Sequence, residues 1–165
     1  MRPKTLAEVA QLTINGDSFD RCLANFLDGF YAAPNARALA DVPPLLAPGL
    51  GEPGRVQDAY LAATAEELAN AHQFPVVAWT ADEARKLHRP WFASPLAGLR
   101  AVPLLESTAA FSSRNLFIGQ NALTRACPPP AAANSALTQR RTPGRGLQTL
   151  LAPLIKMDLA VKVKV

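Results

Sequence analysis

Large aromatic side chains are confined to the first three quarters of the chain. All eleven Phe, Tyr and Trp residues lie between Phe19 and Phe117, and residues 127–165 contain none. A segment without such side chains has little apolar surface with which to build a core. The sequence therefore predicts one folded domain over residues 1–126, followed by a tail over residues 127–165 that is not part of its core.

The charge changes at the same boundary. Residues 1–126 hold 11 Lys and Arg against 12 Asp and Glu, a balance of −1, whereas residues 127–165 hold 6 Lys and Arg against one Asp, a balance of +5. The tail also contains Pro128, Pro129, Pro130, Pro143 and Pro153. We expect a basic, proline-rich and poorly ordered tail, and a nearly neutral domain that is not built to bind nucleic acid.

The composition and the cysteines indicate the class of protein. Hydrophobic residues make up 49% of the chain, which is typical of a globular protein. No apolar run reaches the roughly 18 to 20 residues that a membrane helix needs, and Glu8 and Gln11 interrupt any N-terminal signal sequence. Two cysteines, Cys22 and Cys127, are too few for a disulfide framework. We therefore expect a cytoplasmic protein.

Helical periodicity dominates the predicted domain. The clearest helix begins near Phe19 and ends before Pro34, and further helices are expected over residues 5–12, 36–40 and 55–72. Its apolar stripe, at three- and four-residue spacing, consists of Phe19, Cys22, Leu23, Phe26, Leu27 and Phe30. The sequence predicts an all-α fold, an orthogonal bundle of about five or six short helices.

Proline and glycine interrupt this pattern twice. Residues 41–54 are predicted to form a loop, packed onto the domain by Val42, Leu45, Leu46 and Leu50. A helix over residues 96–106 contains Pro103, and because an interior proline costs about 3 kcal/mol we expect a kink or a break there.

Shorter signals mark the rest of the domain. Thr80 and Glu83 have the spacing of a capping box, which predicts a short helix up to about Leu87. Residues 89–92 are predicted to form a turn, and Ser107 or Thr108 to cap a further helical turn through residue 111. Residues 115–118 are an apolar run typical of a buried loop or helix.

No pattern of residues indicates catalysis, a metal or a cofactor. His72 and His88 have no His, Cys or carboxylate neighbour at metal-ligand spacing. Glu66 and Glu67 are adjacent on a predicted helix and point apart by about 100°, so they cannot form an acid–base pair. The sequence has neither a nucleophile elbow nor a phosphate-binding loop. We expect no enzymatic activity. An unrecognised hydrolase or transferase that depends on His72, His88 or Glu106 is kept as an alternative, ranked behind the two binding functions given below.

One cluster has the composition of a binding surface. Arg89, Trp91 and Phe92 lie close together in the sequence, and Arg100 and Arg114 follow. Arginine beside tryptophan and phenylalanine is typical of interface hot spots. The alternative is that Trp91 and Phe92 fill the end of the core. We predict these five residues as partner contacts and leave that alternative open.

A second basic cluster lies in the tail and consists of Arg140, Arg141 and Arg145. Such a run binds nucleic acid or an acidic protein surface, or is simply solvated. Residues 5–10 also resemble the first helix of a helix-turn-helix. The next helix, however, exposes Asp20 and Asp28, which phosphates would repel.

Several short motifs over about residues 5–126 are shared with a known set of proteins. They are Phe26-Leu27-Asp28 with Phe30-Tyr31, Ala59-Tyr60-Leu61-Ala62-Ala63, Pro75, Trp79, Arg89-Pro90-Trp91-Phe92-Ala93, Leu99-Arg100-Ala101, Glu106-Ser107, Ala109-Ala110-Phe111 and Arg114-Asn115-Leu116-Phe117. Through them the chain resembles a family of small, uncharacterised helical bacterial proteins. It departs from the pattern at Gly29 and Pro103, and entirely after residue 126.

This resemblance implies a partner. Members of the set are often encoded beside nucleotidyltransferase genes of toxin–antitoxin type, and no catalytic role is attached to their motifs. The leading hypothesis is thus a non-enzymatic, antitoxin-like protein that masks a partner such as a nucleotidyltransferase toxin by steric blocking and charge complementarity. The alternative is a small DNA-binding transcriptional regulator that uses the first two helices and the basic tail.

Overall fold

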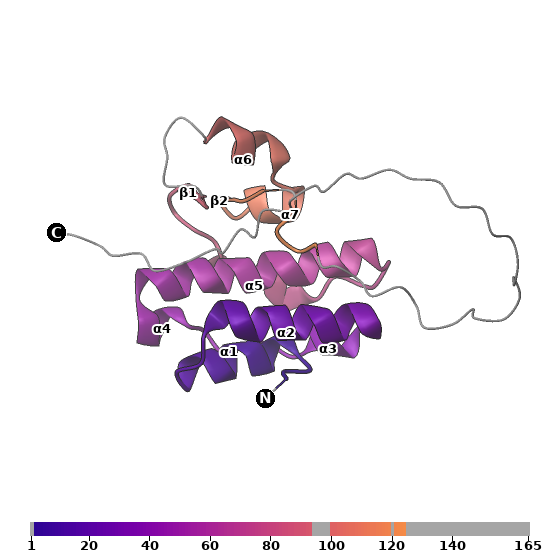
Figure 1. Cartoon of the computed structure of the whole chain (residues 1–165). Coiled ribbons are helices and arrows are strands. Elements are labelled where there is room, and N and C mark those ends of the chain that lie inside the picture. The colour runs from indigo at the N-terminus through magenta and orange to yellow at the C-terminus, as the bar shows by residue number, and fades with distance from the viewer. Residues whose placement is uncertain (1, 94–99, 120, 125–165) are drawn as a thin grey trace, which may run out of the picture. The chain divides into compact units, whose positions relative to one another are not determined.

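The computed structural model describes residues 2–93, 100–119 and 121–124 (Figure 1). These residues form seven α-helices, two short 3-10 helices and a two-stranded sheet. The predicted all-α class is confirmed, with seven α-helices among the described residues where five or six were expected. No helix among these residues is both long and apolar enough to cross a membrane. The predicted tail, residues 127–165, lies outside the described residues.

The chain begins with a helical hairpin of α1 (Leu6–Ile14) and α2 (Phe19–Ala32). The Thr5 side chain accepts a hydrogen bond from the Glu8 amide at 3.1 Å and so caps α1. Gly16 makes the turn with a φ of +99°, a conformation open to glycine. All six residues of the predicted apolar stripe of α2 are buried, which confirms that assignment.

Two short helices, α3 (Arg37–Ala40) and α4 (Ala47–Leu50), precede the long helix α5 (Glu52–Ala71). The segment predicted as a loop thus contains a helical turn. Of the four apolar residues expected to pack it down, only Leu46 is buried. The prediction is wrong for Val42, Leu45 and Leu50, which are exposed. The segment is anchored by a hydrogen bond from the Leu46 amide to Asp58 rather than by an apolar stripe.

Helix α5 is the centre of the domain. In Figure 1 it lies between the α1–α2 hairpin and the layer that contains α7 and the strands. Its buried positions are rich in alanine, among them Ala59, Ala62 and Ala63. Small side chains let neighbouring elements approach α5 closely on several sides, and η1, η2, α4, α7 and β2 all pack against it.

The capping box predicted at Thr80 is not formed. Residues there form two 3-10 turns, η1 (Ala78–Ala81) and η2 (Glu83–Arg85). The Thr80 hydroxyl donates to the Val77 carbonyl at 2.8 Å and is buried, so it is not placed to accept from a following amide. Asp82 instead caps η2.

Residues 89–92 were predicted to form a turn, and residues 115–118 a buried loop or helix. In the structure, these two segments pair with each other. They form β1 (Trp91–Phe92) and β2 (Leu116–Phe117), which run parallel. Between them lie α6 (Ala101–Glu106) and α7 (Ala109–Ser112). Thr108 occupies the N-cap position of α7, but its hydroxyl donates to Glu67 at 2.7 Å and does not cap the helix.

Pro103 neither kinks nor breaks the described helix. It is the third residue of α6, where the backbone amide has no intrahelical partner to lose. Residues 96–99, the first part of the helix predicted over residues 96–106, lie outside the described residues.

Candidate functional site

The segment that carries most of the predicted contact residues is held by backbone hydrogen bonds. The amides of Leu87, Trp91 and Ala93 donate to the carbonyls of residues 114, 115 and 117 at 3.1, 2.8 and 3.0 Å. The Asn115 side-chain amide donates back to the Leu87 carbonyl at 2.7 Å. Residues 87–93 are thus fixed along their length, and the side chains they project have defined positions.

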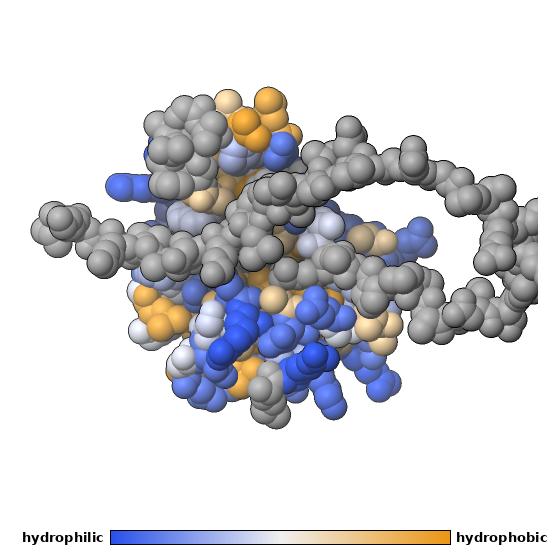
Figure 2. All heavy atoms as spheres, in the orientation of Figure 1, coloured by the Kyte–Doolittle hydropathy of each residue, from blue (hydrophilic) through white to orange (hydrophobic). Residues whose placement is uncertain are grey.

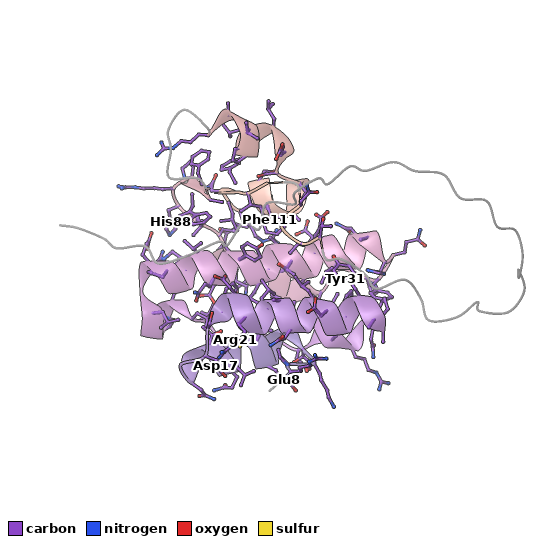
Figure 3. The ribbon with its side chains drawn as sticks, viewed as in Figure 1. Glu8, Asp17, Arg21, Tyr31, His88 and Phe111 are labelled. Atoms are coloured by element: carbon purple, nitrogen blue, oxygen red, sulfur yellow. The ribbon has the colours of Figure 1, made fainter. Side chains whose placement is uncertain are left out.

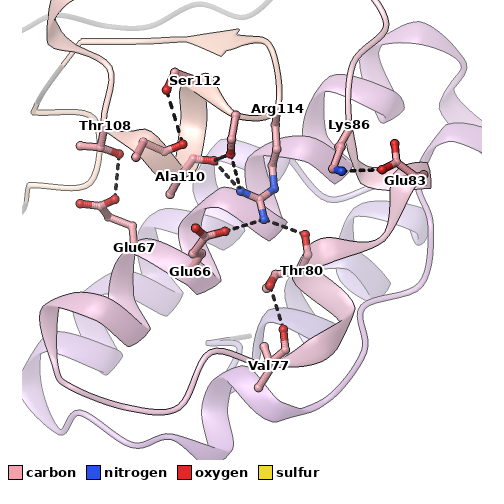
Figure 4. A network of polar contacts seen from close by, with 12 residues as sticks. Glu66, Glu67, Val77, Thr80, Glu83, Lys86, Thr108, Ala110, Ser112 and Arg114 are labelled. Atoms are coloured by element: carbon pink, nitrogen blue, oxygen red, sulfur yellow. Dashed lines mark hydrogen bonds and ion pairs between the residues drawn. The ribbon is translucent and has the colours of Figure 1, made fainter.

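Arg114 is buried beneath this segment and is not a surface residue. Its guanidinium pairs with Glu66 at 2.7 Å and donates to the carbonyls of Thr80 at 2.6 Å and Ala110 at 2.5 Å (Figure 4). Only 3% of it is exposed. The prediction of Arg114 as a partner contact is therefore wrong: its charge is used inside the domain, to join α5, η1 and α7.

Trp91 and Phe92 are each half-buried, so neither ring lies wholly inside the core. Trp91 packs against the core. Phe92 stacks on Phe117, with ring centroids 5.1 Å apart and planes 19° apart. The Arg100 guanidinium lies 5.3 Å from the Phe92 ring, within cation–π range. Arg100 and Arg89 are exposed.

A pocket of about 350 Å³ opens beside Trp91. Its lining includes His88 and Arg89 from the fixed segment and Arg55 from α5. Figure 3 shows His88 above α5, on the side of the strands. Arg55 is paired with Glu52 at 3.6 Å, so the basic character of the pocket comes mainly from Arg89. The carboxylate of Glu52 also lines the pocket, so its walls carry both signs of charge beside the Trp91 ring.

Helix α6 exposes an apolar surface next to Arg100. Leu105 is 88% exposed, and Val102 and Leu104 are about half exposed. Figure 2 shows hydrophobic side chains gathered over α6. Three neighbouring apolar side chains left in water on one short helix are unusual for a surface that binds nothing. We refer to Arg89, Trp91, Phe92, Arg100 and these three residues as the α6 surface.

The other candidate residues are not assembled into a reactive site. The ring of His72 lies against Phe30, Tyr31 and Phe74, with centroids 5.3 to 6.2 Å apart. Cys22 is buried, and burial raises the pKa of its thiol. No three His, Cys, Asp or Glu side chains in the described part of the chain could hold a metal ion together. Arg140, Arg141 and Arg145 lie outside the described residues.

A buried ion pair was missed by sequence reasoning. Asp58 on α5 is fully buried and Arg85 is 2% exposed, and their closest charged atoms lie 3.9 Å apart. The Asp58 carboxylate accepts from the amides of Leu46 at 2.9 Å and Ala47 at 3.0 Å. Arg85 also lies 4.9 Å from the Trp79 ring. The Arg85 guanidinium also donates to the Pro43 carbonyl, so the pair fastens the segment before α4 to α5. Both side chains are buried, so neither charge is exposed at the surface.

A signal for this pair was present in the sequence. Asp58 lies three, four and seven residues before Leu61, Ala62 and Ala65, which is the spacing of one helical face. A charged residue on an otherwise apolar face indicates a buried partner. It does not say which of the distant arginines that partner is.

Comparison with known proteins gives no match. No protein family model, curated protein or solved structure matches this chain. The argument for function therefore depends on the α6 surface itself.

Proposed function

We propose that this chain is a non-enzymatic protein-binding module that works in the cytoplasm and neutralises a partner protein in the manner of an antitoxin. The partner binds the α6 surface. The resemblance described above suggests a nucleotidyltransferase toxin as that partner.

The observation that carries the proposal is the exposure of α6. Leu105 leaves 88% of its surface in water while Pro103, two residues earlier, is buried. Covering a leucine of this kind contributes about 1.5 to 3 kcal/mol, so one short helix offers a substantial part of a binding energy. Leucine and valine on a helix that follows Arg100, itself stacked on Phe92, supply the apolar centre that interfaces need.

Charge restricts the kind of partner. Arg100 directly precedes α6 and Arg89 lies beside Trp91, and neither forms an ion pair with any of the described residues. Unpaired cations at the rim favour a partner whose surface is acidic. A nucleotidyltransferase fits because the Mg²⁺ ions of polymerase-type sites are held by carboxylates. The mechanism would be steric blocking of that acidic site.

The test is a pull-down of the full-length chain from its source cell, with nuclease treatment and mass spectrometry. We expect one stoichiometric acidic partner whose capture is lost in Leu105→Ser and in Arg100→Glu. Val42→Ser is the matched control, since Val42 is an apolar side chain that is 63% exposed and does not belong to the α6 surface. Co-expression should then show that the chain abolishes growth inhibition by that partner.

Two results would contradict the proposal. Equal capture by Leu105→Ser and Val42→Ser would show that α6 is not the contact. Recovery of nucleic acid alone, only before nuclease and only with the tail present, would favour the DNA-binding regulator instead.

A further inference from the structure

A second hollow lies away from the α6 surface, among the N-terminal elements. It is a groove of about 620 Å³ between residues 2–5, α2 and the segment that contains α3. Its apolar lining residues are Pro3, Phe26, Gly29, Phe30, Ala33, Ala38 and Ala40. Pro3, Phe26 and Phe30 are buried, so the accessible apolar lining consists mainly of glycine and alanine. This groove shares no residue with the α6 surface.

Gly29 has no structural reason to be glycine. It lies in the interior of α2, where glycine costs about 1 kcal/mol relative to alanine. A Cβ built at this position would meet nothing within 4 Å. Packing therefore does not exclude a side chain here, and the φ of Gly29 is not positive. A bare backbone at the floor of a groove is what the close approach of a bound molecule requires.

The walls of the groove are basic. Arg2 and Lys4 line one side and Arg37 lines another, and Asp41 is the one carboxylate among the lining residues. All three cations are exposed, and none is in an ion pair with another described residue. Because the domain as a whole is nearly neutral, three unpaired cations around one groove are a local concentration of charge.

We propose that this groove binds an acidic peptide segment of a partner protein. Small side chains of the peptide lie over Gly29 and Ala33, and its carboxylates pair with Arg2, Lys4 and Arg37. Arg2 and Lys4 are two residues apart, a span of at most about 7 Å, and carboxylates at alternate positions of an extended peptide have a similar spacing. The site is independent of the proposed function of the α6 surface.

The experiment measures binding of a fluorescein-labelled peptide of six Glu-Ala repeats to the full-length chain by fluorescence anisotropy. We expect Gly29→Leu to weaken binding at least about tenfold by filling the groove, and Arg37→Glu to weaken it by a similar factor. Ala32→Leu is the matched control, because Ala32 is exposed on α2 but does not line the groove. It should bind within about twofold of the unchanged chain.

The variants can be checked for folding, since a Cβ at Gly29 meets nothing within 4 Å and leucine is a better helix former than glycine. Its melting temperature should equal or exceed that of the unchanged chain. Three results would overturn the proposal: no binding at about 1 mM peptide, equal binding by Gly29→Leu, or equal binding of a peptide of six Gln-Ala repeats. Weaker binding at higher salt is also required.

Discussion

At the scale of single residues, Arg100 and Arg114 carry the same charge in opposite surroundings. Arg100 is exposed and lies against the Phe92 ring, whereas Arg114 is buried with Glu66 and two backbone carbonyls. Their sequence contexts do not distinguish them, because Glu66 lies 48 residues from Arg114. The sequence could thus indicate a cluster of arginines near Trp91 but not which of them faces a partner.

The burial of Arg114 predicts a large effect on stability. Arg114→Met should lower the free energy of unfolding by about 2 to 4 kcal/mol, because the Thr80 carbonyl and Glu66 lose their donor. Arg100→Met, the matched control, should change it by less than about 0.5 kcal/mol. Urea denaturation followed by circular dichroism measures both. Similar small losses in the two variants would contradict the network in Figure 4.

Adding Glu66→Leu separates the two causes. If the unpaired carboxylate is part of the penalty, the double variant should be more stable than Arg114→Met alone. A double variant that is less stable would assign the whole loss to the carbonyl groups and to packing.

The Asp58 carboxyl predicts a dependence of stability on pH. Burial raises the pKa of Asp58, while the amides of Leu46 and Ala47 and the charge of Arg85 act in the opposite direction. A carboxyl whose folded pKa lies above its unfolded value binds its proton more tightly in the folded state. Its contribution to stability is therefore present at low pH and is lost as the pH rises through the folded pKa.

The comparison that isolates this group is with Asp58→Asn, which cannot titrate. The stability of the unchanged chain relative to Asp58→Asn should increase as the pH falls from about 7 towards the ordinary range of a carboxyl, near 4. Denaturant titrations of both proteins across this range measure the difference. A difference that is constant, or that shrinks as the pH falls, would contradict the raised pKa.

At the scale of elements, the sequence predicted what local periodicity encodes. The helices at residues 5–12, 19–33 and 55–72 were correct within a few residues because each has an apolar face several turns long. The strands β1 and β2 were missed because two residues have no period, and their pairing is between segments more than 20 residues apart. The capping box failed because a long-range contact buries Thr80.

The candidate site was predictable only in part, because the sequence shows local patterns but not long-range contacts. Arg89, Trp91, Phe92 and Arg100 do lie in one region, as their closeness in sequence indicates. The exposure of Leu105 could not be predicted from the sequence. Leu105 follows Val102 by three residues, which is the spacing of one apolar helical face. Periodicity identifies an apolar face but does not say whether the core or a partner covers it.

Two glycines within helices allow a prediction about packing between elements. A Cβ at Gly54 on α5 would lie 2.5 Å from the Leu46 carbonyl oxygen and 2.8 Å from the Ala47 amide, whereas a Cβ at Gly29 would meet nothing. Gly54→Ala should therefore destabilise the domain by about 1 to 3 kcal/mol, since backbone must move. Gly29→Ala should stabilise it by about 0.5 to 1 kcal/mol.

Thermal denaturation of the two variants under identical conditions tests this contrast. The two melting temperatures should move in opposite directions from that of the unchanged chain. A gain in stability for Gly54→Ala would show that α4 does not approach α5 as closely as the structure has it.

At the scale of the whole molecule, the core of the described domain includes residues as late in the chain as Leu123. Leu123 is 8% exposed and belongs to the core, and its carbonyl accepts a hydrogen bond from the Tyr31 hydroxyl at 3.1 Å. This contact joins α2 to a residue 92 positions later. Among the described residues, which end at residue 124, the core therefore reaches to within three residues of the boundary predicted near residue 126.

The boundary can be tested with two truncations. A chain ending at residue 126 should unfold with a free energy within about 0.5 kcal/mol of the full-length value, because it keeps every described core residue. A chain ending at residue 119 loses Leu123 and the acceptor of the Tyr31 hydroxyl, so it should be less stable by about 2 to 4 kcal/mol. Urea denaturation of the three proteins distinguishes them. If both truncations were equally destabilised, residues after 126 would have to contribute to the core, and a prediction based on where the aromatic residues end would be wrong.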